Sequence, residues 1–285
     1  NTGIGLETAK ALAKQGAKII LACRDENRGK NAELLVNQIR EKSAHFMKLD
    51  LSDLSQIRLF VNEFKQKYDR LDVLLNNAGL MSPSERLLTK DGFEIQFGTN
   101  HLGHFLLTNL LLDLLKKTQN SRVVNVSSMA HFNKFPCYSK IHLDDYNFEK
   151  KYCMYQTYGQ SKLANVLFTK QLQRIFDKEN LKIKAVCLHP GVVRTELFRY
   201  YNKGYMNYIN SLVYPLINFF LKVLYKALKL IFIVLLRILI NYKQVSIILT
   251  VKLKKVLKKA TMKILLRNYG IYLLSWLNFE IFYII

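Results

Sequence analysis

The first 190 residues of this chain alternate between short apolar segments and longer amphipathic segments. Short runs of Val, Ile and Leu are typical of buried strands, and the longer segments have the periodicity of helices. This alternation predicts βαβ units, that is, a parallel sheet with helices on both faces. The expected strands are 18–23, 45–49, 73–75, 123–126 and 183–188, and the expected helices are 2–15, 27–40, 54–68, 93–115 and 157–176.

Polar residues follow the expected strands at their carboxyl ends. These residues are Arg24, Asp50, Asn76, Ser128 and His189. In open α/β sheets the carboxyl ends of the strands are where ligands bind. The sequence therefore predicts an α/β fold with a doubly wound, Rossmann-like parallel sheet and a ligand site along this edge.

A composition break divides the chain near residue 200. Residues 201–285 carry 13 of the 43 Lys and Arg residues but only 1 of the 21 Asp and Glu residues. Three regions are expected: an α/β domain at 1–200, a connecting region at 201–225 and an atypical basic, hydrophobic tail at 226–285. The excess of positive charge comes without a nucleic-acid-binding motif, so nucleic acid is not an expected partner.

The chain opens with Gly3, Ile4 and Gly5 at the start of the first expected helix. Glycines allow close approach of the backbone to a pyrophosphate, and the helix N-terminus supplies amides for it. A plain helix start explains this short pattern about equally well. The strand that should precede such a turn is not in the sequence, so we expect a domain truncated at its N-terminus.

The next strand ends at Cys23 and is followed by Arg24. An acidic residue at this place would bind the ribose hydroxyls of NAD, whereas a cation suits the 2′-phosphate of NADP. Arg24 therefore favours NADP(H). An exposed loop arginine without a ligand is the alternative.

A Tyr-x-x-x-Lys pattern occurs three times, at Tyr146/Lys150, Tyr158/Lys162 and Tyr225/Lys229. On a helix this spacing places the phenol and the ammonium on one face, where the cation can lower the pKa of the phenol. Most such matches are incidental. Only Tyr158 is preceded by a strand ending in a hydroxyl residue, Ser128, and these groups can surround one carbonyl.

With these residues in order, residues 1–200 resemble the short-chain dehydrogenase/reductase family, and in particular its NADP-preferring retinol/retinal dehydrogenase branch. The resemblance rests on many ordered strings rather than on one motif. The strings are Asn1–Gly5, Leu21–Asp25, Leu49–Asp53, Asn76–Gly79, Asn100–Phe105, Val123–Ser128, Tyr158–Leu167 and His189–Thr195.

The resemblance implies a role for each catalytic residue. Tyr158 would be the general acid and base, and Lys162 would lower its pKa and hold the nicotinamide ribose. Ser128 would bind the substrate carbonyl, and Asn100 would anchor a water-mediated proton relay behind Lys162.

The cofactor would lie against a second set of residues. The resemblance implies that it contacts Gly3, Ile4, Gly5, Arg24, Asp50, Asn77, Gly79, Tyr158, Lys162 and Thr195. No metal is expected, because His101 and His104 have no third ligand at metal-binding spacing and are interpreted as packing or hydrogen-bonding residues.

The resemblance places a substrate lid at 201–225. This region and its immediate surroundings are rich in Tyr and Phe, which suits a hydrophobic alcohol or aldehyde and suits a membrane surface about as well. The expected function is hydride transfer between NADP(H) and such a substrate. The alternative is a non-catalytic fragment or pseudoenzyme whose basic tail associates with membranes.

Three interpretations of the C-terminal part of the chain, including the tail at 226–285, remain open. The first is a membrane-binding appendage, because 251–266 mixes Lys with apolar residues like a basic amphipathic helix. The second is a membrane span, with 204–221 as a marginal candidate. The third, which the A/T-rich codon residue types favour, is translated non-coding sequence. The resemblance further implies a cytoplasmic location or the cytoplasmic face of the endoplasmic reticulum, and a homodimer is one assembly left open.

Overall fold

The structure is a computed structural model, and it describes part of the chain. The described residues are 1–81, 83–133 and 137–190, together with the backbone of strands at 249–252, 261–267, 270–274 and 283–284. The predicted lid at 201–225, the predicted cofactor residue Thr195 and the candidate membrane span at 204–221 lie outside them. The domain boundaries predicted from the sequence therefore stay predictions.

Five strands and the helices between them follow the predicted alternation. The first part of the chain contains α1 (Gly3–Lys14), β1 (Ile19–Cys23), α2 (Glu26–Asn37), β2 (Ala44–Lys48), α3 (Leu54–Lys67) and β3 (Val73–Asn76). The second part contains α4 (Ile95–Phe97), a π-helical turn η1 (Gly98–Leu102), α5 (Gly103–Leu110), α6 (Leu112–Lys117), β4 (Arg122–Val126), the 3-10 turn η2 (Met129–His131), α7 (Met154–Lys178) and β5 (Lys184–Leu188).

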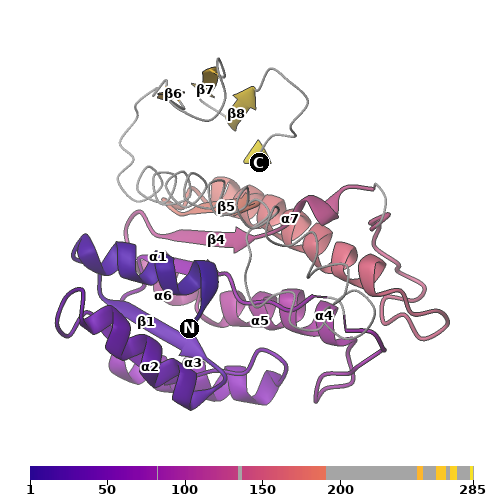
Figure 1. Cartoon of the computed structure of the whole chain (residues 1–285), viewed down its shortest axis with the longest axis horizontal. Helices are drawn as coiled ribbons and strands as arrows, with labels where there is room; N and C mark the ends of the chain where they lie inside the picture. Colours follow the sequence, from indigo (N-terminus) through magenta and orange to yellow (C-terminus); the bar gives the residue numbers. More distant parts are fainter. Residues whose placement is uncertain are drawn as a thin grey trace, which may run out of the picture.

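Every pairing among these five strands is parallel, which confirms the predicted α/β, Rossmann-like class. They form two sheets rather than one, with β1 paired to β2 and β4 lying between β3 and β5. In the described part of the chain no strand hydrogen-bonds to both β1 and β3. Figure 1 shows α1 and α2 beside β1, and α7 running along β4.

Helices cover both faces of the strands and bury separate cores. On one side Ala9 and Ala13 of α1 and Ala32 and Val36 of α2 pack with Leu21 of β1. The larger core lies on the other side, where α3, α5, α6 and α7 meet the strands. Its fully buried members with less than 2% exposure are Ile57, Leu111, Leu115, Val123, Phe176 and Ile183. The fold is therefore doubly wound, as the alternation predicted.

The single long helix predicted at 93–115 is wrong in detail. The chain is helical there, but the π-turn at Gly98–Leu102 and a break at Leu111 (φ −96°, ψ 2°) divide it. Two glycines allow close packing at the π-turn. A Cβ on Gly98 would lie 2.3 Å from Thr89 Cγ2, and one on Gly103 would lie 2.4 Å from the carbonyl oxygen of Leu51. The apolar periodicity of the sequence does not reveal this irregularity.

The described part of the C-terminal tail is strand, so at 251–252 and 261–266 the structure does not have the amphipathic helix that the first of the three interpretations suggested. The tail contains β6 (Leu249–Lys252), β7 (Thr261–Arg267), β8 (Gly270–Leu274) and β9 (Tyr283–Ile284) in an antiparallel sheet. Thr, Val and Ile in these segments favour strands. None of the described helices combines the length and the apolar character that crossing a bilayer requires.

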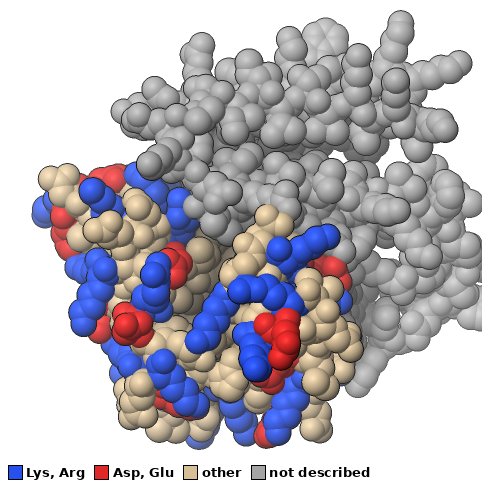
Figure 2. Space-filling view, turned by 90° about the vertical axis from the view of Figure 1, so that its left-hand side faces the viewer, with Lys and Arg blue, Asp and Glu red and all other residues tan. Residues whose placement is uncertain are grey.

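Positive and negative side chains are mixed on the face drawn in Figure 2, where blue Lys and Arg side chains are interspersed with red Asp and Glu. Ion pairs of this kind in the described residues include Lys30–Glu26 at 2.7 Å and Lys67–Glu63 at 2.6 Å, both one helical turn apart. Exposed pairs contribute little stability. They do neutralise part of the positive charge of the α/β domain.

Candidate active site

Helix α7 carries the Tyr158/Lys162 pair on one buried face. Both side chains are 4% exposed, and they are one helical turn apart. Tyr146 lies in the connection before α7 and is 46% exposed, while Tyr225 lies outside the described residues. The structure therefore distinguishes Tyr158 from Tyr146 by burial as well as by helical context.

The end of β4 meets this face of α7 through two serines. Ser128 hydrogen-bonds with Tyr158, and its Oγ also accepts a hydrogen bond from the Ala130 amide at 3.2 Å. The Ser127 hydroxyl donates to the carbonyl oxygen of Lys162 at 2.8 Å. The predicted Ser128, Tyr158 and Lys162 thus come together from a strand end and a helix.

The predicted lowering of the Tyr158 pKa by Lys162 does not hold in this structure. Burial raises the pKa of Tyr158 to about 12, and the hydrogen bond with Ser128 is what acts in the opposite direction. The physical reason is desolvation of the buried phenol, which outweighs any effect of the ammonium, although Lys162 Nζ lies over the ring face, 5.6 Å from its centroid. In this arrangement the phenol is protonated at neutral pH.

Lys162 is fixed by a backbone carbonyl at the end of β4. Its Nζ donates to the Val126 carbonyl oxygen at 3.2 Å. Burial lowers the pKa of Lys162 to about 8, although proximity to Cys187 acts in the other direction. The ammonium is therefore still mostly protonated at pH 7, but it titrates near physiological pH.

Asn100 lies in the π-turn and is fully buried. Its Oδ1 accepts from the Leu80 amide at 2.9 Å, and its Nδ2 donates to the Leu80 carbonyl at 2.9 Å and to Ser161 Oγ at 3.1 Å. The side chain thus fastens the segment after β3 to α7. The proton relay predicted for Asn100 stays a prediction, but its side chain already has a structural use.

Sequence reasoning missed the polar residues of α7 that bind to the π-turn. Asn165 Nδ2 donates to the Asn100 carbonyl at 3.0 Å, and Asn165 Oδ1 contacts His101 Nδ1 at 3.0 Å. One turn further, Thr169 accepts from Asn125 Nδ2 of β4 at 2.8 Å. A signal was present in the sequence, because the polar residues Ser161, Asn165 and Thr169 recur every four residues, on one face of the helix.

The two histidines of the π-turn region form hydrogen bonds, as predicted. His104 Nδ1 contacts the Asn100 carbonyl at 3.0 Å, and burial lowers the pKa of His104 to about 4. His101 packs against Phe97 and Phe168, with ring centroids 5.4 Å and 6.1 Å away. Both imidazoles therefore serve packing, and desolvation holds the pKa of each below its usual value.

The glycines expected to hold a dinucleotide lie where a side chain would not fit easily. Gly3 has a positive φ of 54°, and a Cβ on Gly5 would lie 2.8 Å from Asn77 Nδ2. A Cβ on Gly79 would lie 3.0 Å from Asn100 Oδ1 and 3.6 Å from Lys162 Nζ. The first turn of α1 contains no acidic residue, and Thr2 makes no side-chain cap. These features fit a pyrophosphate on the helix N-terminus.

The other predicted cofactor residues lie near strand ends. Arg24 is exposed directly after β1, and Ile4 packs on the cluster formed by Val124, Val126 and Leu188. Asp50 Oδ1 accepts from the Ser52 amide at 2.9 Å and from its hydroxyl at 2.6 Å. Asp50 therefore already stabilises a turn, and its contact with an adenine stays a prediction.

Comparison with known proteins gives consistent relatives. Residues 1–140 match the family model described as short chain dehydrogenase. Retinol dehydrogenase 12 of Mus musculus is 45% identical over 201 residues, which cover 70% of this chain and 61% of that protein. Retinol dehydrogenase 13 of Homo sapiens is 48% identical over 205 residues, covering 70% and 59%. The matched part of this chain therefore spans about three fifths of the length of these curated relatives.

A solved structure is similar to this chain in both backbone and sequence. The crystal structure of an uncharacterized protein from Mycobacterium paratuberculosis superposes with a TM-score of 0.59 at 43% sequence identity. The match covers 69% of this chain and 67% of that one. The similarity therefore extends to the backbone as well as to the sequence.

Proposed function

Because the chain belongs to the short-chain dehydrogenase/reductase family, we propose that it transfers a hydride between NADP(H) and a hydrophobic alcohol or aldehyde. One observation carries the proposal: Ser128 hydrogen-bonds with the buried Tyr158, and Lys162 lies over the same ring. A hydroxyl, a phenol and an ammonium at one strand end are the groups that carbonyl–alcohol chemistry requires.

The protein residues would handle the proton and the developing charge. The hydride itself is supplied or accepted by the nicotinamide when it is bound. Ser128 would donate a hydrogen bond to the substrate carbonyl oxygen. Tyr158, protonated at neutral pH because burial raises its pKa to about 12, would give its proton to the alkoxide that forms during reduction. Lys162, whose Nζ lies over the face of the Tyr158 ring, would hold the nicotinamide ribose.

The preference for NADP(H) rests on Arg24. Its guanidinium follows β1 and is exposed, with Asp25 turned into the N-cap of α2, where it accepts from the Arg28 amide at 2.9 Å. An arginine in this place suits a 2′-phosphate. Replacing Arg24 with Asp should lower the affinity for NADPH much more than that for NADH, which cofactor titrations by fluorescence would measure. Equal losses for both cofactors would contradict the assignment.

The proposal of a hydrophobic substrate rests on the similarity to retinol dehydrogenases. Retinal is therefore the first aldehyde to assay. With retinal and NADPH, Tyr158→Phe should lower kcat by about 10²-fold or more, the contribution typical of a general acid. Tyr146→Phe is the matched control, because it removes an exposed phenol from another Tyr-x-x-x-Lys match and should leave kcat unchanged.

A second candidate is a chain that does not catalyse turnover. The observation that favours it is the separation of the parallel strands into a β1–β2 sheet and a β3–β4–β5 sheet, since the dinucleotide would lie across this separation. The two candidates differ in a direct binding measurement. NADPH binding by the full chain, measured by calorimetry, is expected for the enzyme, and its absence would support the non-catalytic alternative.

A further inference from the structure

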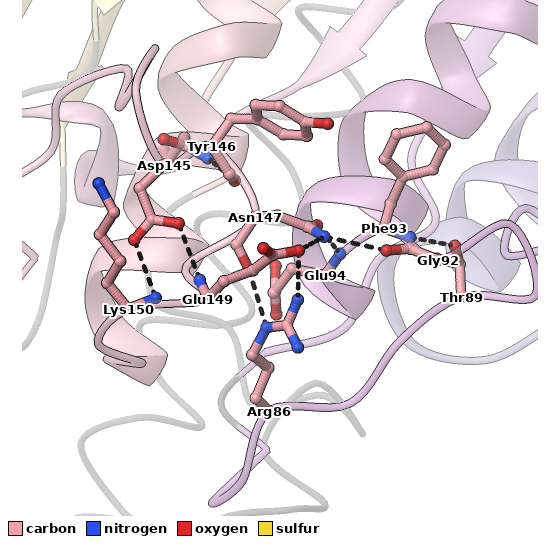
Figure 3. Close-up of polar contacts among 11 residues, drawn as sticks. Arg86, Thr89, Gly92, Phe93, Glu94, Asp145, Tyr146, Asn147, Glu149 and Lys150 are labelled. Carbon is pink, nitrogen blue, oxygen red and sulfur yellow. Dashed lines mark hydrogen bonds and ion pairs between the residues drawn. The ribbon is translucent and has the colours of Figure 1, made fainter.

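Asn147 connects two segments that border the candidate active site. It lies in the connection between β4 and α7, and Figure 3 shows it between Arg86, Gly92 and Glu94 of the segment that follows β3. Its Oδ1 accepts from the Glu94 amide at 2.6 Å, and its Nδ2 donates to the Gly92 carbonyl at 3.0 Å. Its own carbonyl accepts from Arg86 Nε at 2.9 Å. One residue thus makes three contacts across more than 50 positions of sequence.

The contact with Glu94 continues into α7. Glu94 is the N-cap of α4, where its Oε2 accepts from the Phe97 amide at 2.8 Å. Gln96, inside α4 and fully buried, donates through Nε2 to the Met154 carbonyl at 2.9 Å and to Thr157 Oγ1. Met154 is the first residue of α7, and Thr157 directly precedes Tyr158. Asn147 is therefore linked to the helical turn that carries the phenol through two hydrogen-bonded contacts, the first to Glu94 and the second from Gln96 to Thr157.

The same connection is held from the other side by α7 itself. Gln160, two residues after Tyr158 and fully buried, accepts from the His142 amide at 2.9 Å and donates to the Tyr146 carbonyl at 2.8 Å. Amide side chains thus fix residues 142–147 between the start of α4 and the first turns of α7. Buried amides hold a fixed geometry because each lost partner leaves an unsatisfied polar group.

We propose that Asn147 is a positioning residue, which sets the place of the Tyr158 phenol by fastening the β4–α7 connection to the N-terminus of α4. Asn147 does not contact the phenol. The inference rests on the proposed function only for its effect on turnover, since the effect on the helical turn is a property of the fold. A misplacement of about 1 Å of a catalytic group is enough to lower a rate substantially.

The first test does not depend on enzymatic activity. Hydrogen–deuterium exchange on the full chain should become about fivefold faster or more across 152–160 in Asn147→Ala, and stay unchanged in α3 at 54–67. Lys150→Ala is the matched control, because it changes an exposed side chain three residues away and keeps the backbone contact with Asp145. Exchange across 152–160 that matches this control would overturn the inference.

The second test separates positioning from a general loss of structure. With kcat expressed per NADPH-binding site, Asn147→Ala should lower kcat about tenfold and leave the NADPH dissociation constant within about twofold. An unchanged kcat per site would overturn the inference. If the unsubstituted chain binds NADPH but does not reduce retinal, the proposed function fails, and the exchange result alone decides the role of Asn147.

A milder variant covers the case in which Asn147→Ala does not fold. Asn147→Asp keeps an acceptor for the Glu94 amide but loses the donor to Gly92 and places a negative charge beside Glu149, 3.1 Å from Nδ2. The exchange rate across 152–160 in Asn147→Asp should be lower than in Asn147→Ala and higher than in Lys150→Ala. Exchange at the level of that control would again count against the positioning role.

Discussion

Burial acts in opposite directions on the two ionisable residues of the candidate site. Desolvation disfavours the charged form, so it raises the pKa of the Tyr158 phenol to about 12 and lowers that of the Lys162 ammonium to about 8. Burial therefore moves two pKa values that ordinarily lie close together apart, to about 12 and about 8. The phenol holds its proton through the neutral range, whereas the buried ammonium gives up its proton much more readily than an exposed lysine does.

The burial of Lys162 gives a stability that depends on pH. Its folded pKa, about 8, lies below the ordinary value of 10.5, so between these pH values the unfolded state binds more protons and stability rises with pH. Below pH 8 the full cost applies, roughly 3 kcal/mol from the size of the shift. From pH 7.5 to 10 the free energy of unfolding should increase by about 2 kcal/mol more in the unsubstituted chain than in Lys162→Met.

Urea denaturation at several pH values would check this. The two curves of unfolding free energy against pH should converge or cross as Lys162 loses its proton. Tyr158 contributes with the opposite sign. Because its pKa is higher in the folded state, stability falls as the pH rises above 10. Tyr158 is present in both proteins, so it affects both curves. Parallel curves for the two proteins would mean that Lys162 is not desolvated.

The sequence predicted which residues meet, but not their ionisation. Ser128, Tyr158 and Lys162 come together as the motif order implied. The direction of the Tyr158 pKa shift was missed, because it depends on how deeply α7 buries the phenol and on Lys162 facing the Val126 carbonyl. Burial depth is a result of tertiary packing, and a four-residue spacing does not report it.

At the scale of elements, the π-turn Gly98–Leu102 is the feature that organises the site. It directs Asn100 toward the segment after β3, and there the side chain makes hydrogen bonds to both backbone groups of Leu80 and to Ser161. Strands, α3 and α7 were predictable from periodicity to within a few residues. The π-turn was not, since the apolar pattern of 93–115 continues through it and its cause is the close packing of Gly98 and Gly103 against distant residues.

Removing the Asn100 side chain should loosen several elements at once. In Asn100→Ala the Leu80 amide and carbonyl lose buried partners, each worth about 1–3 kcal/mol when left unsatisfied. We therefore expect the free energy of unfolding to fall by at least about 2 kcal/mol in urea denaturation. Asn109→Ala is the matched control, because Asn109 is exposed on α5 and its side chain donates within that helix, to the Phe105 carbonyl at 2.8 Å. Equal effects of both substitutions would show that the Asn100 contacts are not formed.

At the scale of the whole molecule, the described chain packs around unequal cores. The cluster joining α1, α2 and β1 contains seven buried apolar residues, whereas the cluster joining α3, α5, α6 and α7 to the strands contains seventeen. Hydrogen bonding in the sheets follows the same division, because β1–β2 and β3–β4–β5 are separate. Met47 and Leu49 belong to the larger cluster, and Ile20 of β1 packs against it, so these residues make apolar contacts across the division.

Such an arrangement predicts that the two parts do not open together. The β1–β2 part has the smaller core and no shared strand hydrogen bonds with β3, so it should open at a lower free energy than the β3–β4–β5 part. In native-state hydrogen exchange at increasing urea concentrations, the amides of 19–23 should show a lower free energy of opening than the amides of 122–126. NADPH should reduce the difference in opening free energy between the two parts, since a dinucleotide held by Gly5, Arg24 and Asn77 would contact both. A single common opening for both strands, with or without NADPH, would mean that Met47 and Leu49 already couple them into one cooperative unit.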